Sequence, residues 1–172
     1  MGLLQLRRRC QSTLLALVLV ISFLFSIAQP VDAASSGAIR AFDDVAATTQ
    51  DYSGQDLVQA EFGDARLVGA NFSGANLRGA VFNGANLSQA NWRGVDFSDG
   101  IAYLSNLSGA DLTDAVLTSA MLLKTSFRGA TVTGADFSDA MLDRDQIIQL
   151  CRTAEGINSV TGVETRESLG CR

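Results

Sequence analysis

The side chains most able to support chemistry in this chain are two pairs of carboxylates, Asp96 with Asp99 and Asp111 with Asp114. Paired carboxylates can share the roles of general acid and general base. Histidine is absent from all 172 residues, which excludes a Ser-His or Cys-His nucleophile and removes the commonest metal ligand. The sequence also has no calcium loop and no Cys/His quartet of known spacing. We therefore read the carboxylates as a solvated surface, and predict a protein that is not an enzyme and holds no cofactor or metal.

The charge balance narrows the choice of partners. The chain has 13 basic and 18 acidic residues, a formal charge of −5. Proteins that bind nucleic acid by neutralising phosphates carry the opposite excess. We therefore predict no nucleic-acid partner, and the length fits a single domain.

A signal peptide is predicted over residues 1–33. Arg7–Arg9 form a basic start, an apolar run covers Leu14–Ala28, and Val31–Ala33 permits cleavage before Ala34, with Ser26–Ala28 as a second possible site. A permanent anchor is the alternative, because the run approaches the length of a membrane span, but its serines weaken that interpretation. We expect export, cleavage and no stable membrane insertion afterwards. Cleavage takes the net charge from −5 to −7.

A strict period of five begins at Gln50. One position in each group of five is apolar through nineteen consecutive groups, and the position two residues earlier is nearly always small, most often alanine. One group, Gly100–Leu104, keeps the frame with only Ala102 at its centre, which indicates a thinner core or a short bulge. The apolar column consists of Tyr52, Leu57, Phe62, Leu67, Phe72, Leu77, Phe82, Leu87, Trp92, Phe97, Ala102, Leu107, Leu112, Leu117, Leu122, Phe127, Val132, Phe137 and Leu142.

A period of five fits neither an α-helix, which needs 3.6 residues per turn, nor a flat strand, which needs two. It does fit a chain that turns a corner every five residues, with one large and one small side chain pointing inward on each side. Such coils must stack, because a single coil cannot bury its own apolar face. The pattern therefore predicts an all-β solenoid.

The repeats Ala70-Asn71-Phe72-Ser73-Gly74 and Ala135-Asp136-Phe137-Ser138-Asp139 resemble the signature of the pentapeptide-repeat family, in which alanine is followed by Asp or Asn and then a large apolar residue. The resemblance covers residues 50–144. It implies a right-handed quadrilateral β-helix with four pentads per coil and nearly five coils in all.

Both ends of such a solenoid need covering, because they expose unpaired backbone. At the C-terminus Asp143 and Gln146 have the spacing of a capping box, Gly156 supplies a stop signal, and a second helical turn is expected around Arg166–Leu169. We therefore predict a helical cap over residues 145–172. Residues 34–49 are predicted to cap the other end, with a short helix over Ala38–Ala47.

Two cysteines, Cys151 and Cys171, follow the leader, and an even pair in an exported protein predicts a disulfide. It would close a loop of about 20 residues and stabilise the fold by roughly 3 kcal/mol. The stretch from Asp143 to Cys171 resembles the helical, disulfide-clipped cap of thylakoid-lumenal pentapeptide-repeat proteins from cyanobacteria and plants. Because a plant precursor would carry a longer, two-part leader, the resemblance favours a cyanobacterial protein in the thylakoid lumen or periplasm.

With four pentads per coil, residues 20 apart stack on one side. Three sides are then mainly polar, and the fourth carries apolar residues at its outward positions, which we call the apolar stripe: Val81, Ile101, Tyr103, Met121, Leu123 and Met141. A stripe of this kind often marks an interface. The alternative is that the protein covers it with its own residues 34–50 or with the region after Asn158.

These features favour a non-catalytic interaction or scaffold protein that binds an unknown protein partner, as a monomer or weak homo-oligomer. The resemblance also allows a DNA mimic that inhibits a DNA-binding enzyme such as gyrase, although the export signal disfavours it. A carbohydrate-active β-helix enzyme is a third possibility, but such enzymes have longer, irregular coils and a charged cleft, which this sequence lacks.

Overall fold

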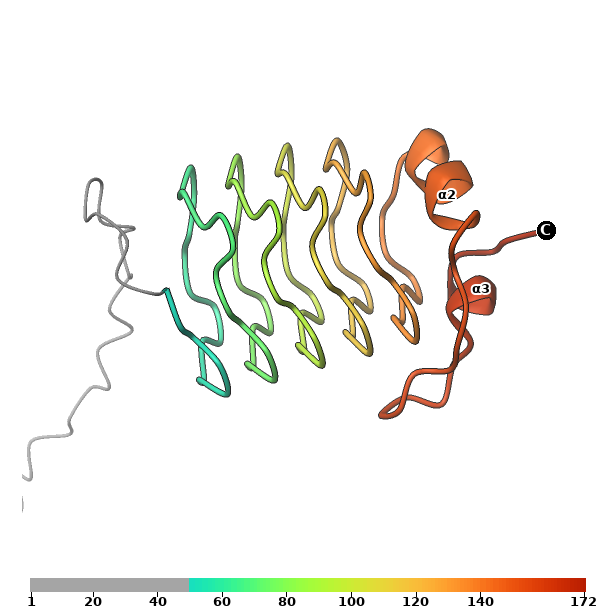
Figure 1. The fold of residues 1–172 in the computed structure, drawn as a ribbon, viewed down its shortest axis with the longest axis horizontal. Helices are drawn as coiled ribbons and strands as arrows, with labels where there is room; N and C mark the ends of the chain where they lie inside the picture. Colours follow the sequence, from blue (N-terminus) through green and yellow to red (C-terminus); the bar gives the residue numbers. More distant parts are fainter. Residues whose placement is uncertain (1–49) are drawn as a thin grey trace, which may run out of the picture. The chain divides into compact units, whose positions relative to one another are not determined.

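The computed structural model describes residues 50–172, so the predictions for residues 1–33 and 34–49 lie outside the described residues. From Asp51 onward the chain forms a four-sided solenoid (Figure 1). Each residue at the start of a side pairs in parallel with the residue 20 positions later, from Asp51 with Asn71 to Met121 with Met141. This register confirms four pentads per coil. The right hand of the coil stays a prediction.

The outward column of each side runs along the solenoid axis, one residue per coil. Side 1 carries Asp51, Asn71, Asn91, Asp111 and Thr131; side 2 carries Asp56, Asn76, Asp96, Val116 and Asp136; side 3 carries Glu61, Val81, Ile101, Met121 and Met141; side 4 carries Arg66, Asn86, Asn106 and Ser126.

Tight turns join the sides. The N–H of Gln55 donates to the carbonyl of Tyr52 at 3.2 Å, and the same bond recurs around the coils. Only the second of the two central turn residues has a positive φ, the conformation of a type II turn. Nine of these eighteen positions hold glycine and nine hold other residues, so glycine alone marks only half of the corners.

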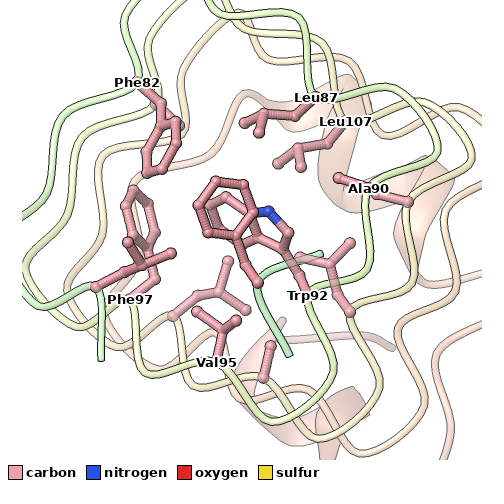
Figure 2. Close-up of a cluster of buried hydrophobic side chains, with 14 of the residues drawn as sticks. Phe82, Leu87, Ala90, Trp92, Val95, Phe97 and Leu107 are labelled. Carbon is pink, nitrogen blue, oxygen red and sulfur yellow. The ribbon is translucent and has the colours of Figure 1, made fainter. Parts of the chain in front are cut away.

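The interior is filled by the large residue of each pentad. Figure 2 shows Phe82, Leu87, Trp92 and Phe97 pointing inward from the four successive sides of one coil, and all four are fully buried. Equivalent rings stack between coils, as in the pair Phe62 and Phe82, whose centroids lie 4.6 Å apart. The alanine column leaves the space that these rings occupy.

Two short helices close the C-terminal end: α2 (Arg144–Leu150) and α3 (Thr165–Ser168) (Figure 1). Asp143 is the N-cap of α2 and forms the predicted capping box with Gln146. The amide of Gln146 also donates to the carbonyls of Leu122 at 2.8 Å and Thr125 at 2.6 Å. The cap thus satisfies the Thr125 carbonyl, which has no further coil to pair with, and adds a second bond to the Leu122 carbonyl.

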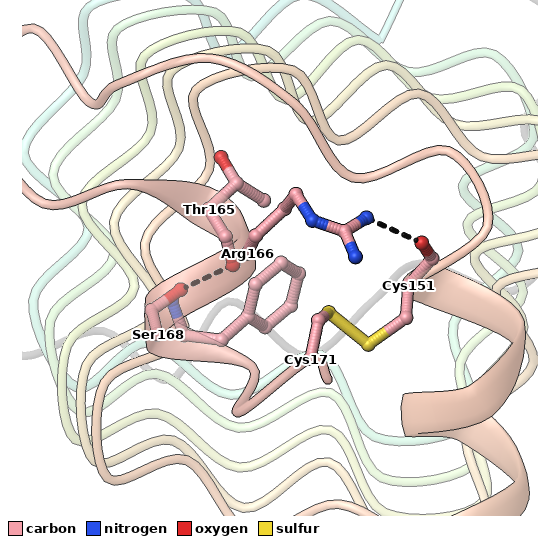
Figure 3. The surroundings of a disulfide bond; sticks show 6 residues. Cys151, Thr165, Arg166, Ser168 and Cys171 are labelled. Carbon is pink, nitrogen blue, oxygen red and sulfur yellow. Dashed lines mark hydrogen bonds between the residues drawn. A yellow bond between two sulfur atoms is a disulfide. The ribbon is translucent and has the colours of Figure 1, made fainter.

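The expected stop of α2 at Gly156 is wrong, because the helix ends at Leu150. Arg166 donates to the carbonyl of Cys151 at 2.9 Å, and Cys151 is bonded to Cys171 (Figure 3). These contacts turn the chain away directly after the helix. Gly156 instead packs on the last coil, where an added Cβ would lie 2.9 Å from the backbone nitrogen of Gly134.

The disulfide holds α3 against the end of the solenoid. Cys151 and Cys171 have a Cα–Cα distance of 5.6 Å and both pack partly buried against the core. In α3, Ser168 accepts a hydrogen bond from the backbone N–H of Phe137 at 3.0 Å and donates to the carbonyl of Thr165 at 2.9 Å (Figure 3). The bridge therefore fixes the segment that covers the last coil.

Candidate interaction surface

The structure brings the residues of the apolar stripe together on side 3 and its corner. Val81 pairs with Ile101, Ile101 with Met121, and Met121 with Met141, so the column is continuous over four coils. Tyr103 and Leu123 occupy the turns that follow Ile101 and Met121. The stripe therefore forms one surface, and its role in binding stays a prediction.

Exposure along the stripe is greatest at the corner and at its C-terminal end. Tyr103 is 40% exposed and Met141 46%, while the remaining four members are partly buried. Leu104, which sequence reasoning missed, is 60% exposed beside Tyr103 and has a φ of +57°. A left-handed conformation is costly for a leucine and exposes its side chain on the corner. The signal in the sequence was the apolar residue at the second central position of this turn, where every other corner has glycine or a polar residue.

The polar columns show what the stripe lacks. On side 1, Asn71 accepts from the N–H of Ser73 at 3.1 Å and from the amide of Asn91 at 3.1 Å, and donates to Asp51 at 3.0 Å. An Asn or Asp at this position therefore satisfies the next corner and ties neighbouring coils together. Apolar side chains can do neither.

Because the stripe has apolar side chains at this position, backbone N–H groups in the turns beside it lack a side-chain acceptor. The described residues supply no acceptor for the backbone N–H of Asn83 or Leu123, whereas the N–H of Tyr103 donates to the Asn83 side chain at 3.3 Å. A segment lying on the stripe would thus find an apolar strip with hydrogen-bond donors along its margin.

The degenerate pentad supports this surface without the bulge that the sequence allowed. The pairing of Ile101 with Met121 keeps the register. Gly100 is required there, because an added Cβ would lie 2.3 Å from the ring of Phe97, which occupies the space beside this glycine. The bulge is therefore absent from this pentad, and the thinner core at Ala102 stays a prediction.

Side chains hold the turn that carries Tyr103 and Leu104. The hydroxyl of Thr125 donates to the carbonyl of Ala102 and accepts from the N–H of Ser105. Both hydroxyl residues are buried, and they replace alanine at the small position of their pentads. The exposed apolar corner is thus anchored from inside the solenoid.

The region after Asn158 does not cover the stripe, so that alternative was wrong. The Asn158 amide donates to the carbonyls of Gly134 at 2.8 Å and Ala115 at 3.3 Å, and the Ser159 N–H to Asp114 at 3.4 Å. These bonds hold the segment over side 2 and its corner. A groove of about 410 Å³ lies there between Val116 and Val160.

The carboxylate pairs are used in turns. Asp96 accepts from the N–H and hydroxyl of Ser98, and Asp111 accepts from Thr113 and pairs with Arg93 at 3.2 Å. Burial raises the pKa of Asp111, but the hydrogen bonds from Thr113 and the charge of Arg93 outweigh it and hold the pKa below its usual value. A carboxyl group that stays ionised is unsuited to act as a general acid.

Asp136 behaves in the same way on side 2. Burial raises its pKa, but hydrogen bonds from Ser138 and Thr161 outweigh that effect and lower the pKa below 3.8. Within residues 50–172 no group of three or more potential ligands could hold a metal, and no helix of that part is long and apolar enough to cross a membrane.

Comparison with known proteins agrees with this geometry. The family model for pentapeptide repeats matches residues 53–84, 80–99 and 104–139, leaving out most of the degenerate pentad. A crystal structure of a pentapeptide repeat protein from the thylakoid lumen of Arabidopsis thaliana is 43% identical, with a TM-score of 0.58, over 72% of this chain and 86% of that one. This chain belongs to the pentapeptide-repeat family.

Two curated Arabidopsis thaliana proteins are similar over shorter stretches of the repeat. The thylakoid lumenal 15 kDa protein 1 is 51% identical over 27% of this chain, and the thylakoid lumenal protein TL20.3 is 58% identical over 25%. The matches span only 21% and 15% of these relatives. Both of these relatives carry thylakoid-lumenal names.

Proposed function

We propose that this pentapeptide-repeat protein is a non-catalytic interaction protein, exported to the thylakoid lumen or periplasm, that binds another protein through the apolar stripe. The lumenal relatives support the compartment, as do the predicted leader and the disulfide, since disulfides persist in oxidising compartments. Carboxylates engaged in turns, in a chain without histidine, support a binding role over a catalytic one.

The observation that carries the proposal is the apolar column on side 3. Sides 1 and 4 have polar outward residues throughout, and side 2 is interrupted only by Val116, which lies beneath the C-terminal segment. On side 3, four consecutive coils are apolar, and the corner beside them exposes Tyr103 and Leu104. Exposed aromatic and aliphatic side chains at one place are typical of binding hot spots.

The size of the stripe indicates a modest contact. Three steps between coils of about 4.8 Å give a length of about 14 Å, and one side is roughly 10 Å wide, about three extended residues. A stable protein pair buries about 800 Å² from each partner, several times that area. We therefore expect a transient complex, or one in which the stripe anchors a short segment of the partner.

Site-specific photocrosslinking in the exported compartment tests the proposal. A photoreactive residue replaces Ile101 on the stripe, and the control replaces Asn91, which has the equivalent position on side 1. We expect a discrete adduct with a second protein from Ile101 alone, and its loss when Met121→Lys is added. Equal adducts from both positions, or adducts only within the chain itself, would overturn the proposal.

A further inference from the structure

The last coil leaves two backbone donors without acceptors at the corner between sides 4 and 1. In the coil before it, the N–H groups of Leu107 and Gly109 donate to carbonyls of the last coil at 2.8 Å and 2.9 Å. Phe127 and Gly129 hold the same positions in the last coil, and the described residues supply no acceptor for their N–H groups. We call these two groups the edge donors. They face the C-terminal end of the stack, because they continue the same row of hydrogen bonds.

Elsewhere on this edge the C-terminal cap supplies the acceptors. The N–H of Lys124 donates to the Asp143 side chain at 2.8 Å. The N–H of Gly134 donates to the carbonyl of Glu155 at 2.8 Å. Folded proteins rarely leave such groups without a partner, so the edge donors are the place where a ligand would complete the edge.

A groove of about 370 Å³ lies between this corner and the end of α2. The polar side chains that line it can all donate hydrogen bonds: Arg128, Gln149, Arg152 and Thr153. Arginine has no acceptor atom and stays charged in proteins. No carboxylate of residues 50–172 lines the groove, and neither arginine takes part in an ion pair with another residue of that range. We call it the donor groove.

The end of α2 opposes an anion only weakly. A helix C-terminus carries a partial negative charge on its last carbonyls. Here the carbonyls of Ile147 and Leu150 already accept from the N–H groups of Cys151 and Ala154, both at 2.9 Å. Arg152 follows directly after the cap of the helix and compensates the remaining charge. The two arginines therefore set the potential of the donor groove.

This arrangement suits a phosphoryl group. Arginine binds phosphate through paired N–H groups, and backbone N–H groups at turns form anion sites in other folds. A carboxylate offers only two oxygens, whereas the donors here come from the edge donors and four side chains. The volume reaches the range of small-molecule sites. The apolar side chains of the lining are buried and can pack against an organic part of the ligand: Phe127, Ala130 and Leu150.

We propose that the donor groove binds a phosphomonoester, with its phosphoryl group on Arg128, Arg152 and the edge donors. The site lies at a different corner from the apolar stripe, so it adds a ligand to the proposed protein contact. Arg128 belongs to the last coil and Arg152 to the segment after α2. A bound phosphoryl group therefore joins the cap to the solenoid and stabilises the fold.

Isothermal titration calorimetry of the purified exported protein with phenyl phosphate, in low salt at neutral pH, tests the proposal. Arg152→Gln should raise the dissociation constant about tenfold or more, because it removes a charged donor. Gln149→Glu keeps both arginines and should also raise it, because it adds a negative charge to the groove. Arg144→Gln is the matched control, since Arg144 is exposed at the start of α2 and lies outside the groove. It should change the constant by no more than about twofold.

Two further measurements identify the ligand class. Benzoate carries the same ring with a carboxylate and should bind more weakly than phenyl phosphate. Vesicles of phosphatidylcholine with phosphatidic acid present a phosphomonoester on a membrane. Flotation of the protein with these vesicles, lost in Arg152→Gln, would assign the phosphoryl group to a lipid headgroup, and no flotation would assign it to a soluble ester.

Thermal unfolding without ligand shows that each variant folds, and phenyl phosphate should raise the midpoint of the original protein but not that of Arg152→Gln. The site is overturned if phenyl phosphate does not bind, or if benzoate binds as tightly. Equal weakening by Arg144→Gln and Arg152→Gln would also overturn it, because the attraction would then come from overall charge. The apolar stripe takes no part in these measurements, so the groove can fail while the proposed function stands.

Discussion

Gly100 is the position where one added methyl group should matter most. Its Cβ would lie 2.3, 2.5 and 2.6 Å from three atoms of the Phe97 ring, closer than real contacts allow. The ring cannot retreat, because Phe97 is fully buried and its centroid lies 5.1 Å from that of Trp92 and 5.8 Å from that of Phe82. Gly100→Ala therefore overpacks the core in the pentad that presents Tyr103 and Leu104.

The expected cost follows from this geometry. Forcing an extra carbon into a packed core destabilises the fold by about 1–3 kcal/mol. Replacing glycine by alanine also lowers the conformational entropy of the unfolded chain, which stabilises the fold by about 0.4–1 kcal/mol. We expect Gly100→Ala to lower the free energy of unfolding by about 1–2 kcal/mol. Gly63→Ala is the matched control, because its Cβ would meet nothing closer than 3.8 Å and its φ also lies outside the left-handed region. It should be neutral or slightly stabilising.

Equilibrium urea unfolding followed by circular dichroism, with the disulfide intact, measures both variants. The slope with urea must stay constant for the comparison to hold, because solenoids can lose cooperativity. Adding Phe97→Leu to Gly100→Ala should recover stability relative to the sum of the single changes, since it removes the clash. A Gly100→Ala protein as stable as Gly63→Ala, or strictly additive effects, would refute the steric argument.

Three further changes test the cap, the corner and a buried carboxylate. Thr125→Val should cost about 1–3 kcal/mol in chemical unfolding, because it leaves two backbone groups of the turn without their partner; the same change at exposed Thr131 should have little effect. Replacing Cys151 and Cys171 by serine should lower the free energy of unfolding by about 3 kcal/mol, because the unfolded chain gains the entropy of the opened loop. An unchanged thermal midpoint would contradict a stabilising role of the disulfide. The depressed pKa of Asp136 means that its carboxylate stabilises the fold above its unfolded pKa of 3.8, and that this contribution disappears as the pH falls through the lower folded value. Asp136→Asn should therefore flatten the acid side of a stability–pH profile, and a profile as steep as that of the original protein would exclude the role.

Much of the candidate surface could be predicted from the sequence, because a solenoid converts sequence spacing directly into spatial neighbours. Once the period is five and the coil holds four pentads, Ile101 must lie between Val81 and Met121. The contribution of Leu104 could not be read in the same way. Its exposure depends on a positive φ that half of the corners adopt without glycine, so the absence of glycine did not mark this corner as unusual.

The C-terminal segment shows where sequence reasoning failed. Its chain length allows it to reach any side, and hydrogen bonds to carbonyls of the last two coils decide between them. The buried Asn158 amide donates to the carbonyls of Gly134 and Ala115 and so fixes the segment there. That choice leaves the stripe uncovered by this part of the chain.

The sequence by itself determined the period, the inward columns, the capping box at Asp143 and the pairing of the two cysteines, because each depends on local spacing or on a count. The tertiary structure decided which groups share a corner. Thr125 can bridge Ala102 and Ser105 only because stacking places residues more than 20 positions apart within hydrogen-bonding distance. Likewise, the fit of Phe97 beside Gly100 depends on side-chain volumes in three dimensions. The period of the sequence carries no information about those volumes.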